Sequence, residues 1–97
     1  MATPMLDYWT VYLLTCPEGG FYVGQTRQRL CHRVAGHRYD AEKGRRKTHL
    51  SDRIKEVGIL SFKSCILVTA NSLDRALEAE RHFIDYFGRK GVLYNDR

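Results

Sequence analysis

Hydrophobic residues recur along this chain with two spacings, a period of two that is typical of strands and a period near 3.6 that is typical of helices. Stretches rich in aromatic and β-branched residues favour strands, and Pro, Gly, Asn and Ser between the periodic stretches favour turns and helix ends. The pattern predicts two strands, two helices, a third strand and a last helix, at 8–15, 21–23, 28–42, 50–57, 62–69 and 73–87. A loose tail, 1–7, would precede a single domain, 8–97.

The first two strands are expected to form a hairpin, because a proline and two glycines lie between them. Alternation along the first strand places Tyr12 on one side and Val11 and Leu13 on the other. Gly24 is expected to end the second strand where the backbone passes close to another group. Whether Tyr12 and Tyr22 share a face depends on a register that the sequence does not fix.

The helix at 28–42, with Thr26 as its expected N-cap, carries charge on an apolar stripe. Arg33 and His37 are four residues apart, so they lie one turn from each other on the face that also carries Leu30 and Val34. That face points inward or into a cleft, and a buried charge there needs a partner. One interpretation is chemical; the other is a structural salt bridge beside a core histidine.

The last helix shows a similar anomaly. Asn71 or Ser72 is its expected N-cap, and its inward stripe is predicted to be Leu73, Leu77, Glu80, Ile84 and Phe87. Glu80 thus occupies a position that an amphipathic pattern gives to an apolar side chain. Such a carboxylate must be protonated, salt-bridged or bound to a cation, and the structural alternative is a buried pair with Arg33.

Composition fits a soluble globular domain of 97 residues, with 43% hydrophobic and 28% charged residues. No apolar run approaches the roughly 20 residues of a membrane span, and no signal-peptide pattern opens the chain. Three widely spaced cysteines without a C-x-x-C pair indicate neither a zinc site nor a disulfide framework, although Cys31 with His32 or His37 could be imagined as metal ligands. Reduced thiols in a cytoplasmic protein are expected.

The net charge of +5 favours a polyanionic partner, of which nucleic acid is the commonest. Basic residues gather in the middle third of the chain, and a solvated loop tip at 43–47 is the alternative interpretation of part of this cluster. These residues are expected to contact phosphates without reading sequence: Arg27, Arg38, Lys43, Arg45, Arg46, Lys47 and His49.

Five ordered landmarks resemble the GIY-YIG nuclease family. They are Thr10-Val11-Tyr12, Tyr22-Val23-Gly24, Arg33 with His37 one turn later, Glu80 followed by Ile84, and Asn95 behind Leu93 and Tyr94. The resemblance spans about Trp9 to Asn95 and departs from the first signature at Thr10, where the family has glycine. It implies an α+β fold, a three-stranded antiparallel sheet flanked by helices in the order β-β-α-α-β-α.

The resemblance also implies a metal-dependent endonuclease that hydrolyses DNA phosphodiester bonds. Glu80 would hold one divalent cation, Mg²⁺ or Mn²⁺, and Arg33 would bind the scissile phosphate. Tyr12 would be the general base, with its pKa lowered by the metal and Arg33, and Tyr22 would help to position the reactants. His37 would accept or relay the proton, or act as the base itself, because imidazole titrates near neutrality.

The last landmark, Asn95, would orient water or hold Glu80 in place. The expected partner is duplex or branched DNA, cut by a freestanding module of bacterial or phage origin that takes specificity from substrate shape, a homodimer or a partner protein. Two alternatives remain: a catalytically inactive relative that binds nucleic acid or a partner protein, and a module that binds structured RNA.

Overall fold

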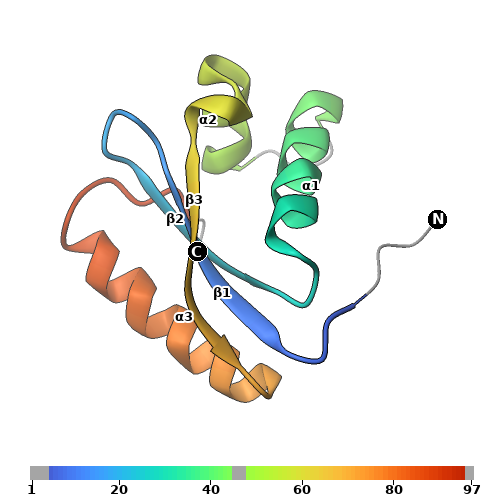
Figure 1. The fold of residues 1–97 in the computed structure, drawn as a ribbon. Coiled ribbons are helices and arrows are strands. Elements are labelled where there is room, and N and C mark those ends of the chain that lie inside the picture. The colour runs from blue at the N-terminus through green and yellow to red at the C-terminus, as the bar shows by residue number, and fades with distance from the viewer. Residues whose placement is uncertain (1–4, 45–47, 96–97) are drawn as a thin grey trace.

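Three strands, β1 (Trp9–Thr15), β2 (Phe21–Thr26) and β3 (Lys63–Ala70), form an antiparallel sheet in the order β2-β1-β3. The helices are α1 (Leu30–Lys43), α2 (His49–Val57) and α3 (Leu73–Gly88), with a 3-10 turn, η1 (Ile59–Ser61), before β3. This computed structural model describes residues 5–44 and 48–95. Figure 1 shows α1 and α2 on one face of the sheet and α3 on the other. The predicted antiparallel sheet and element order are confirmed.

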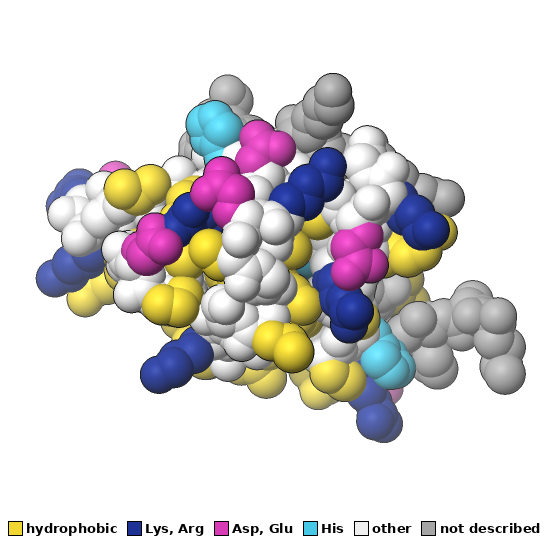
Figure 2. Space-filling model, turned by 90° about the horizontal axis from the view of Figure 1, so that it is seen from above, with side chains coloured by type: hydrophobic (Ala, Val, Ile, Leu, Met, Phe, Trp, Pro, Cys, Tyr) yellow, Lys and Arg dark blue, Asp and Glu magenta, His cyan; other side chains and the backbone are white. Residues whose placement is uncertain are grey.

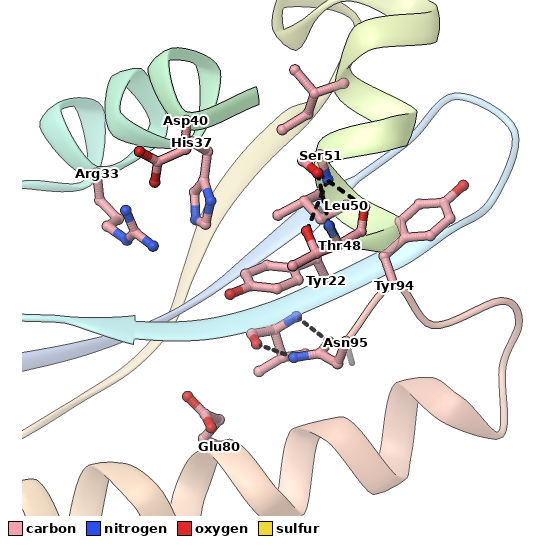
Figure 3. Close-up of a pocket in the computed structure, with 12 residues that line it drawn as sticks. Tyr22, Arg33, His37, Asp40, Thr48, Leu50, Ser51, Glu80, Tyr94 and Asn95 are labelled. Carbon is pink, nitrogen blue, oxygen red and sulfur yellow. Dashed lines mark hydrogen bonds between the residues drawn. The ribbon is translucent and has the colours of Figure 1, made fainter. Parts of the chain in front are cut away.

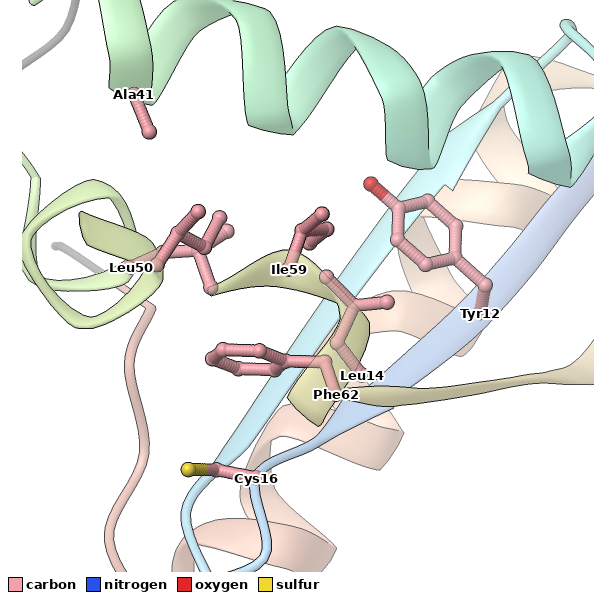
Figure 4. Close-up of a cluster of buried hydrophobic side chains, with 8 residues drawn as sticks. Tyr12, Leu14, Cys16, Ala41, Leu50, Ile59 and Phe62 are labelled. Atoms are coloured by element: carbon pink, nitrogen blue, oxygen red, sulfur yellow. The ribbon is translucent and has the colours of Figure 1, made fainter. Parts of the chain in front are cut away.

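The central strand β1 is buried on both faces, as its aromatic and β-branched composition requires. Val11 and Leu13 pack towards α3, whereas Tyr12 and Leu14 belong to the cluster under α1 and α2 (Figure 4). Full burial of one such aliphatic side chain stabilises a fold by roughly 1.5–3 kcal/mol. The packing on both faces of the sheet therefore fixes the position of Tyr12 between the two helical layers.

The hairpin register places Tyr12 opposite Gly24 and Leu14 opposite Tyr22. Residues directly opposite each other in an antiparallel pair lie on one face, so Tyr12 and Tyr22 share a face, with ring centroids 6.2 Å apart. Gly24 lies within β2, which continues to Thr26, so the expected end of the strand was wrong. The expected close approach of another group to the Gly24 backbone is confirmed, because a Cβ at Gly24 would lie 2.5 Å from the Tyr12 hydroxyl oxygen.

Helix boundaries differ from the expected ones where local hydrogen bonds decide them. Thr26 is the last residue of β2, and its Oγ1 accepts a hydrogen bond from the Gln28 amide, so α1 begins only at Leu30. Gly44 ends α1 in the left-handed conformation at φ 66°, as expected of a glycine there. A capping box between Thr48 and Ser51 starts α2, with each side chain accepting from the other residue's amide.

The contact face of α3 keeps Ile84 and Phe87 of the predicted stripe but differs from it in the first half of the helix. Ala76 and Ile84 are buried against the sheet, whereas Leu73 and Leu77 are 42% and 37% exposed. The small Ala76 allows α3 to approach the sheet closely, and its neighbour Leu77 is turned by about 100° around the helix axis. Ser72 caps this helix by accepting a hydrogen bond from the Arg75 amide.

The chain after α3 returns along the free edge of β2. Phe21 forms a parallel bridge with Leu93, its amide donates to Val92, and the Tyr94 amide donates to the Phe21 carbonyl. At the other end, Leu6, expected in the loose tail, exchanges hydrogen bonds with Arg27. None of the helices in the described ranges is long and apolar enough to cross a membrane.

Candidate active site

A cavity of about 350 Å³ lies where α1, α2, β2, α3 and the returning C-terminal segment meet. Five of the six residues proposed from the sequence as catalytic line it: Tyr22, Arg33, His37, Glu80 and Asn95. In Figure 3, Arg33 and His37 descend from α1 on one side of β2, and Glu80 rises from α3 on the other. The sixth residue, Tyr12, is 1% exposed and lies behind this lining.

Tyr12 and His37 form the central hydrogen bond of the site. The Tyr12 hydroxyl oxygen is 2.7 Å from His37 Nε2, and both side chains are buried. The Tyr22 ring meets the imidazole edge-on, with 5.2 Å between the ring centroids. The imidazole is therefore held by one phenol and packed against another.

The pKa of the Tyr12 phenol is raised well above its usual range. Burial is the main cause and Tyr22 adds to it, while the Arg33 guanidinium acts in the opposite direction. Arg33 lowers this pKa, as expected, but desolvation outweighs the guanidinium and the net shift of the Tyr12 pKa is upward. The phenol is neutral at pH 7 and serves as a hydrogen-bonding group.

Arg33 lies half-buried in the wall of the cavity, close enough to Tyr12 to influence its ionisation. The neighbouring Gly36 has a specific relation to it, because a Cβ at Gly36 would lie 3.2 Å from an Arg33 guanidinium nitrogen. A glycine inside a helix costs about 1 kcal/mol relative to alanine. Its benefit at this position is the room it leaves for the guanidinium.

Glu80 is half-buried on α3 and lines the same cavity as Arg33 and His37. Among the residues that the structure describes, no three His, Cys, Asp or Glu side chains gather to hold a metal. The Glu80 carboxylate in this polar cavity nevertheless suits Mg²⁺, which keeps several waters and is often bound through one or two carboxylates. The donor set therefore fits one loosely held divalent cation and no closed metal cage.

Asn95 binds the backbone of β2 with both ends of its carboxamide. Its Oδ1 accepts from the Val23 amide at 3.0 Å, and its Nδ2 donates to the Val23 carbonyl at 2.7 Å. The side chain thus imitates one more residue of the parallel pairing that begins at Phe21. These two bonds fix the C-terminal segment against β2, and the expected role of Asn95 towards water or Glu80 stays a prediction.

The basic residues expected to contact phosphates have diverse surroundings. Arg27 binds the Leu6 carbonyl and lies over the Trp9 ring, and Arg38 pairs with Glu42 at 3.0 Å. Lys43 and His49 are exposed, whereas Arg45, Arg46 and Lys47 lie outside the described residues. On the face seen in Figure 2, basic and acidic side chains are interspersed.

Sequence reasoning missed the other residues that line the cavity. They are Val23, Asp40, Thr48, Leu50, Ser51, Ile54 and Tyr94. Asp40 carried a signal, because it lies seven residues after Arg33 and therefore two turns along the same side of α1. The α2 residues carried none, since the sequence did not show that the start of α2 faces β2.

The fold is α+β, and its cavity joins a guanidinium, an imidazole, phenols and carboxylates. Residues 8–95 match the model of the GIY-YIG catalytic domain, and the chain belongs to the GIY-YIG family. Membership indicates an endonuclease that acts on DNA, and nucleases of this family generally use a divalent metal ion. No curated protein and no solved structure matches the chain.

Proposed function

We propose that this protein is a metal-dependent endonuclease that hydrolyses DNA phosphodiester bonds at the cavity between α1 and α3. The observation that carries the proposal is the meeting of Arg33, His37 and Glu80 in one cavity, although their helices lie on opposite faces of the sheet. Partly burying charged groups together costs stability, so their meeting in one cavity needs a reason other than stability. Phosphodiester hydrolysis gives each of them a role.

Arg33 binds the scissile phosphate. Its planar guanidinium donates two parallel hydrogen bonds to phosphate oxygens, a geometry that lysine cannot reproduce. Negative charge increases on those oxygens as the pentacovalent transition state forms, so a guanidinium fixed beside them stabilises that state more than the ground state.

His37 takes the proton from the attacking water, and Tyr12 positions it. Two observations favour His37 over Tyr12 as the base: His37 lines the cavity whereas Tyr12 lies behind it, and burial raises the Tyr12 pKa. When His37 Nε2–H donates to the Tyr12 oxygen, Nδ1 is left as the proton acceptor. Tyr22 packs against the imidazole and presents its phenol to the cavity, where it orients water or phosphate.

Glu80 holds one divalent cation, Mg²⁺ or Mn²⁺. When bound, the ion supplies positive charge that stabilises the pentacovalent phosphorus and the departing 3′ oxygen. The carboxylate is a hard oxygen ligand of the type that these cations prefer. Asn95 keeps β2 tied to the C-terminal segment that follows α3, and so keeps Glu80 in register with Tyr22.

DNA backbone on either side of the cut contacts the basic residues around the cavity. Lys43 and His49, at the facing ends of α1 and α2, are the described residues best placed for this, and we assign Arg45, Arg46 and Lys47 between them to the same role. Such contacts bind duplex or branched DNA without reading sequence and weaken steeply with salt. Specificity would come from substrate shape, a second copy or a partner protein.

The test is incubation of plasmid and branched DNA with Mg²⁺ and either the purified protein, Glu80→Gln or Arg33→Ala. Glu78→Gln and Arg75→Ala change exposed residues of α3 and serve as matched controls. Cleavage by wild type and controls, with loss in both site variants, is the expected result. Equal cutting by all five proteins would place the activity elsewhere. Binding without cutting would favour the inactive relative, and preference for RNA in competition would change the substrate class.

A further inference from the structure

Three ionisable side chains of α1 line the cavity, and the proposed chemistry uses only the first two, Arg33 and His37. Figure 3 draws the third, Asp40, beside both of them. We propose that the Asp40 carboxylate acts through His37: its negative charge stabilises the imidazolium that forms when His37 takes a proton, and so makes His37 a stronger base. This inference deepens the proposed nuclease function and rests on it for the role of His37.

The course of α1 keeps Asp40 close to His37. Asp40 follows His37 by three residues within the helix, which continues to Lys43. Side chains at this spacing are neighbours on a helix surface, with about 5–6 Å between their Cβ atoms. Both side chains line the same cavity, so both project from the same side of α1. The helix backbone therefore holds the carboxylate within the range at which one charge changes the ionisation of another group.

The charge of Asp40 is not neutralised by a partner of its own. Asp40 is half-buried, and within the described ranges, 5–44 and 48–95, the structure gives its carboxylate no hydrogen bond or ion pair. Glu42, two residues later, shows the contrast, because it is exposed and pairs with Arg38 at 3.0 Å. A half-buried carboxylate without a partner costs stability, and water and salt screen its field less than that of a surface charge. The position of Asp40 therefore needs a reason other than stability.

The other titratable groups around His37 leave a role for a stabilising negative charge. Those that face it or share its cavity from other elements are Tyr12 of β1, Tyr22 of β2, Tyr94 of the C-terminal segment and, from the other side of β2, Glu80 of α3. From α2 and its cap, hydroxyl and aliphatic groups line the cavity. On α1 itself, the Arg33 guanidinium disfavours a second positive charge on His37. Under the proposed function the cation neutralises Glu80, so Asp40 is the carboxylate that offsets Arg33.

Asp40 has two effects on the reaction. As hydrolysis proceeds, a proton passes from water to His37 Nδ1, the water oxygen bonds to phosphorus and the 3′ oxygen departs, while Asp40 stays ionised. Positive charge thus develops on the imidazole in the transition state, and the carboxylate stabilises that state more than the ground state. The same carboxylate repels the phosphate at Arg33 and weakens substrate binding. Asp40 therefore raises both kcat and KM, a combination that a purely structural residue does not produce.

The first experiment measures the coupling without metal, DNA or activity. The full chain is labelled with ¹³C, and the titration of its four histidines is followed by NMR, with His37→Gln used to assign the His37 signals. Asp40→Asn should move the midpoint of the His37 titration to lower pH by about 0.5–1 pH units, because the imidazolium loses a nearby opposite charge. Asp40→Glu keeps the charge and should restore the midpoint to within about 0.2 pH units of wild type.

Glu42→Gln is the matched control, because it removes one negative charge from an exposed position of the same helix. It should leave the midpoint of the His37 titration where it is in the wild type. Equal midpoints in wild type and Asp40→Asn would overturn the proposal, and so would equal shifts in Asp40→Asn and Glu42→Gln. Broadening by Mn²⁺ of signals around Asp40 rather than Glu80 would also overturn it, because Asp40 would then be a cation ligand.

The second experiment follows cleavage of a labelled duplex with Mg²⁺ over a range of pH. In Asp40→Asn the acid limb of the kcat profile should move to lower pH, and kcat on the plateau should fall about two- to fivefold, because a weaker base accepts the proton less readily. KM should fall as well, since the phosphate loses a neighbouring like charge. A KM that rises, or a kcat profile identical to that of wild type, would contradict the proposal.

The two experiments separate the role of Asp40 from the proposed function. If the titration shows the coupling and the protein cuts no DNA, the nuclease proposal fails and the effect of Asp40 on His37 stands. If cleavage depends on His37 and Glu80 while Asp40→Asn changes neither the titration nor the kcat profile, the nuclease proposal stands and the role of Asp40 is refuted.

Discussion

The Tyr12 hydroxyl and His37 Nε2 lie 2.7 Å apart, although the two residues are separated by 25 positions in the chain. The bond joins the central strand of the sheet to α1 and is sheltered from solvent on both sides. It therefore has two measurable consequences, one for the reaction and one for the folded state.

Replacing His37 and Tyr12 one at a time should distinguish the general base from the residue that positions it. His37→Ala removes the proposed general base and should lower kcat by about 10²–10⁴-fold. Tyr12→Phe keeps the ring and removes one hydrogen bond to the imidazole, so kcat should fall by only about tenfold. Steady-state cleavage of a labelled duplex at several pH values gives both numbers. An inactive Tyr12→Phe beside an active His37→Ala would make Tyr12 the base.

The raised pKa of Tyr12 should also appear in stability at alkaline pH. In the unfolded chain the phenol ionises near pH 10, whereas in the folded chain burial keeps the proton bound to higher pH. The unfolded state then binds fewer protons than the folded state, so the free energy of unfolding falls as the pH rises above 10, by up to about 1.4 kcal/mol per pH unit. Urea titrations should show a smaller fall in Tyr12→Phe, and identical slopes for both proteins would contradict the assignment.

The Asn95 carboxamide should contribute to stability through both of its bonds to Val23. Asn95→Ala leaves one backbone donor and one acceptor without partners and should lower the free energy of unfolding by about 2 kcal/mol. Asn95→Asp should be as harmful, because a carboxylate cannot donate to the Val23 carbonyl. Asn71→Ala, at an exposed position, is the control. Loss of cleavage by Asn95→Ala with unchanged stability would mean that Asn95 acts in the chemistry instead.

Gly36 should show opposite effects on stability and activity. Gly36→Ala improves helix propensity and should raise the free energy of unfolding by about 0.5–1 kcal/mol. Its methyl group would press on the Arg33 guanidinium and displace it by a few tenths of an ångström, so kcat should fall while KM changes little. Ala35→Gly, at an exposed position of α1, should lower stability without changing kcat. An unchanged kcat in Gly36→Ala would show that Arg33 tolerates a neighbour there.

The sequence predicts the fold well because its local signals agree with the packing. Period-two alternation identified β1, and Gly44 and Ser72 marked helix ends through their own backbone and side-chain chemistry. The predicted stripe of α3 is correct at Ile84 and Phe87 but wrong at Leu73 and Leu77, for a tertiary reason. Leucine at position 77 is more hydrophobic than alanine at 76, yet close approach to the sheet favours the smaller residue.

The candidate site was predictable where a residue broke the pattern of its own element. Arg33 and Glu80 were both conspicuous as charges on apolar stripes, and both line the cavity. Three features were hidden because they depend on contacts between distant segments. They are the depth of Tyr12 behind Gly24, the pairing of Asn95 with Val23, and the place of Asp40 in the lining of the cavity.

Residues from the helices on both faces of the sheet line the cavity, and these two layers meet around the outer strand β2. During synthesis, the first half of the chain can place Arg33 and His37 together, yet Glu80 comes much later and Asn95 last of all. A nascent or partly unfolded chain therefore lacks part of the proposed reaction centre. Under the proposed function, cleavage would therefore begin only after the segment that follows α3 has docked on β2.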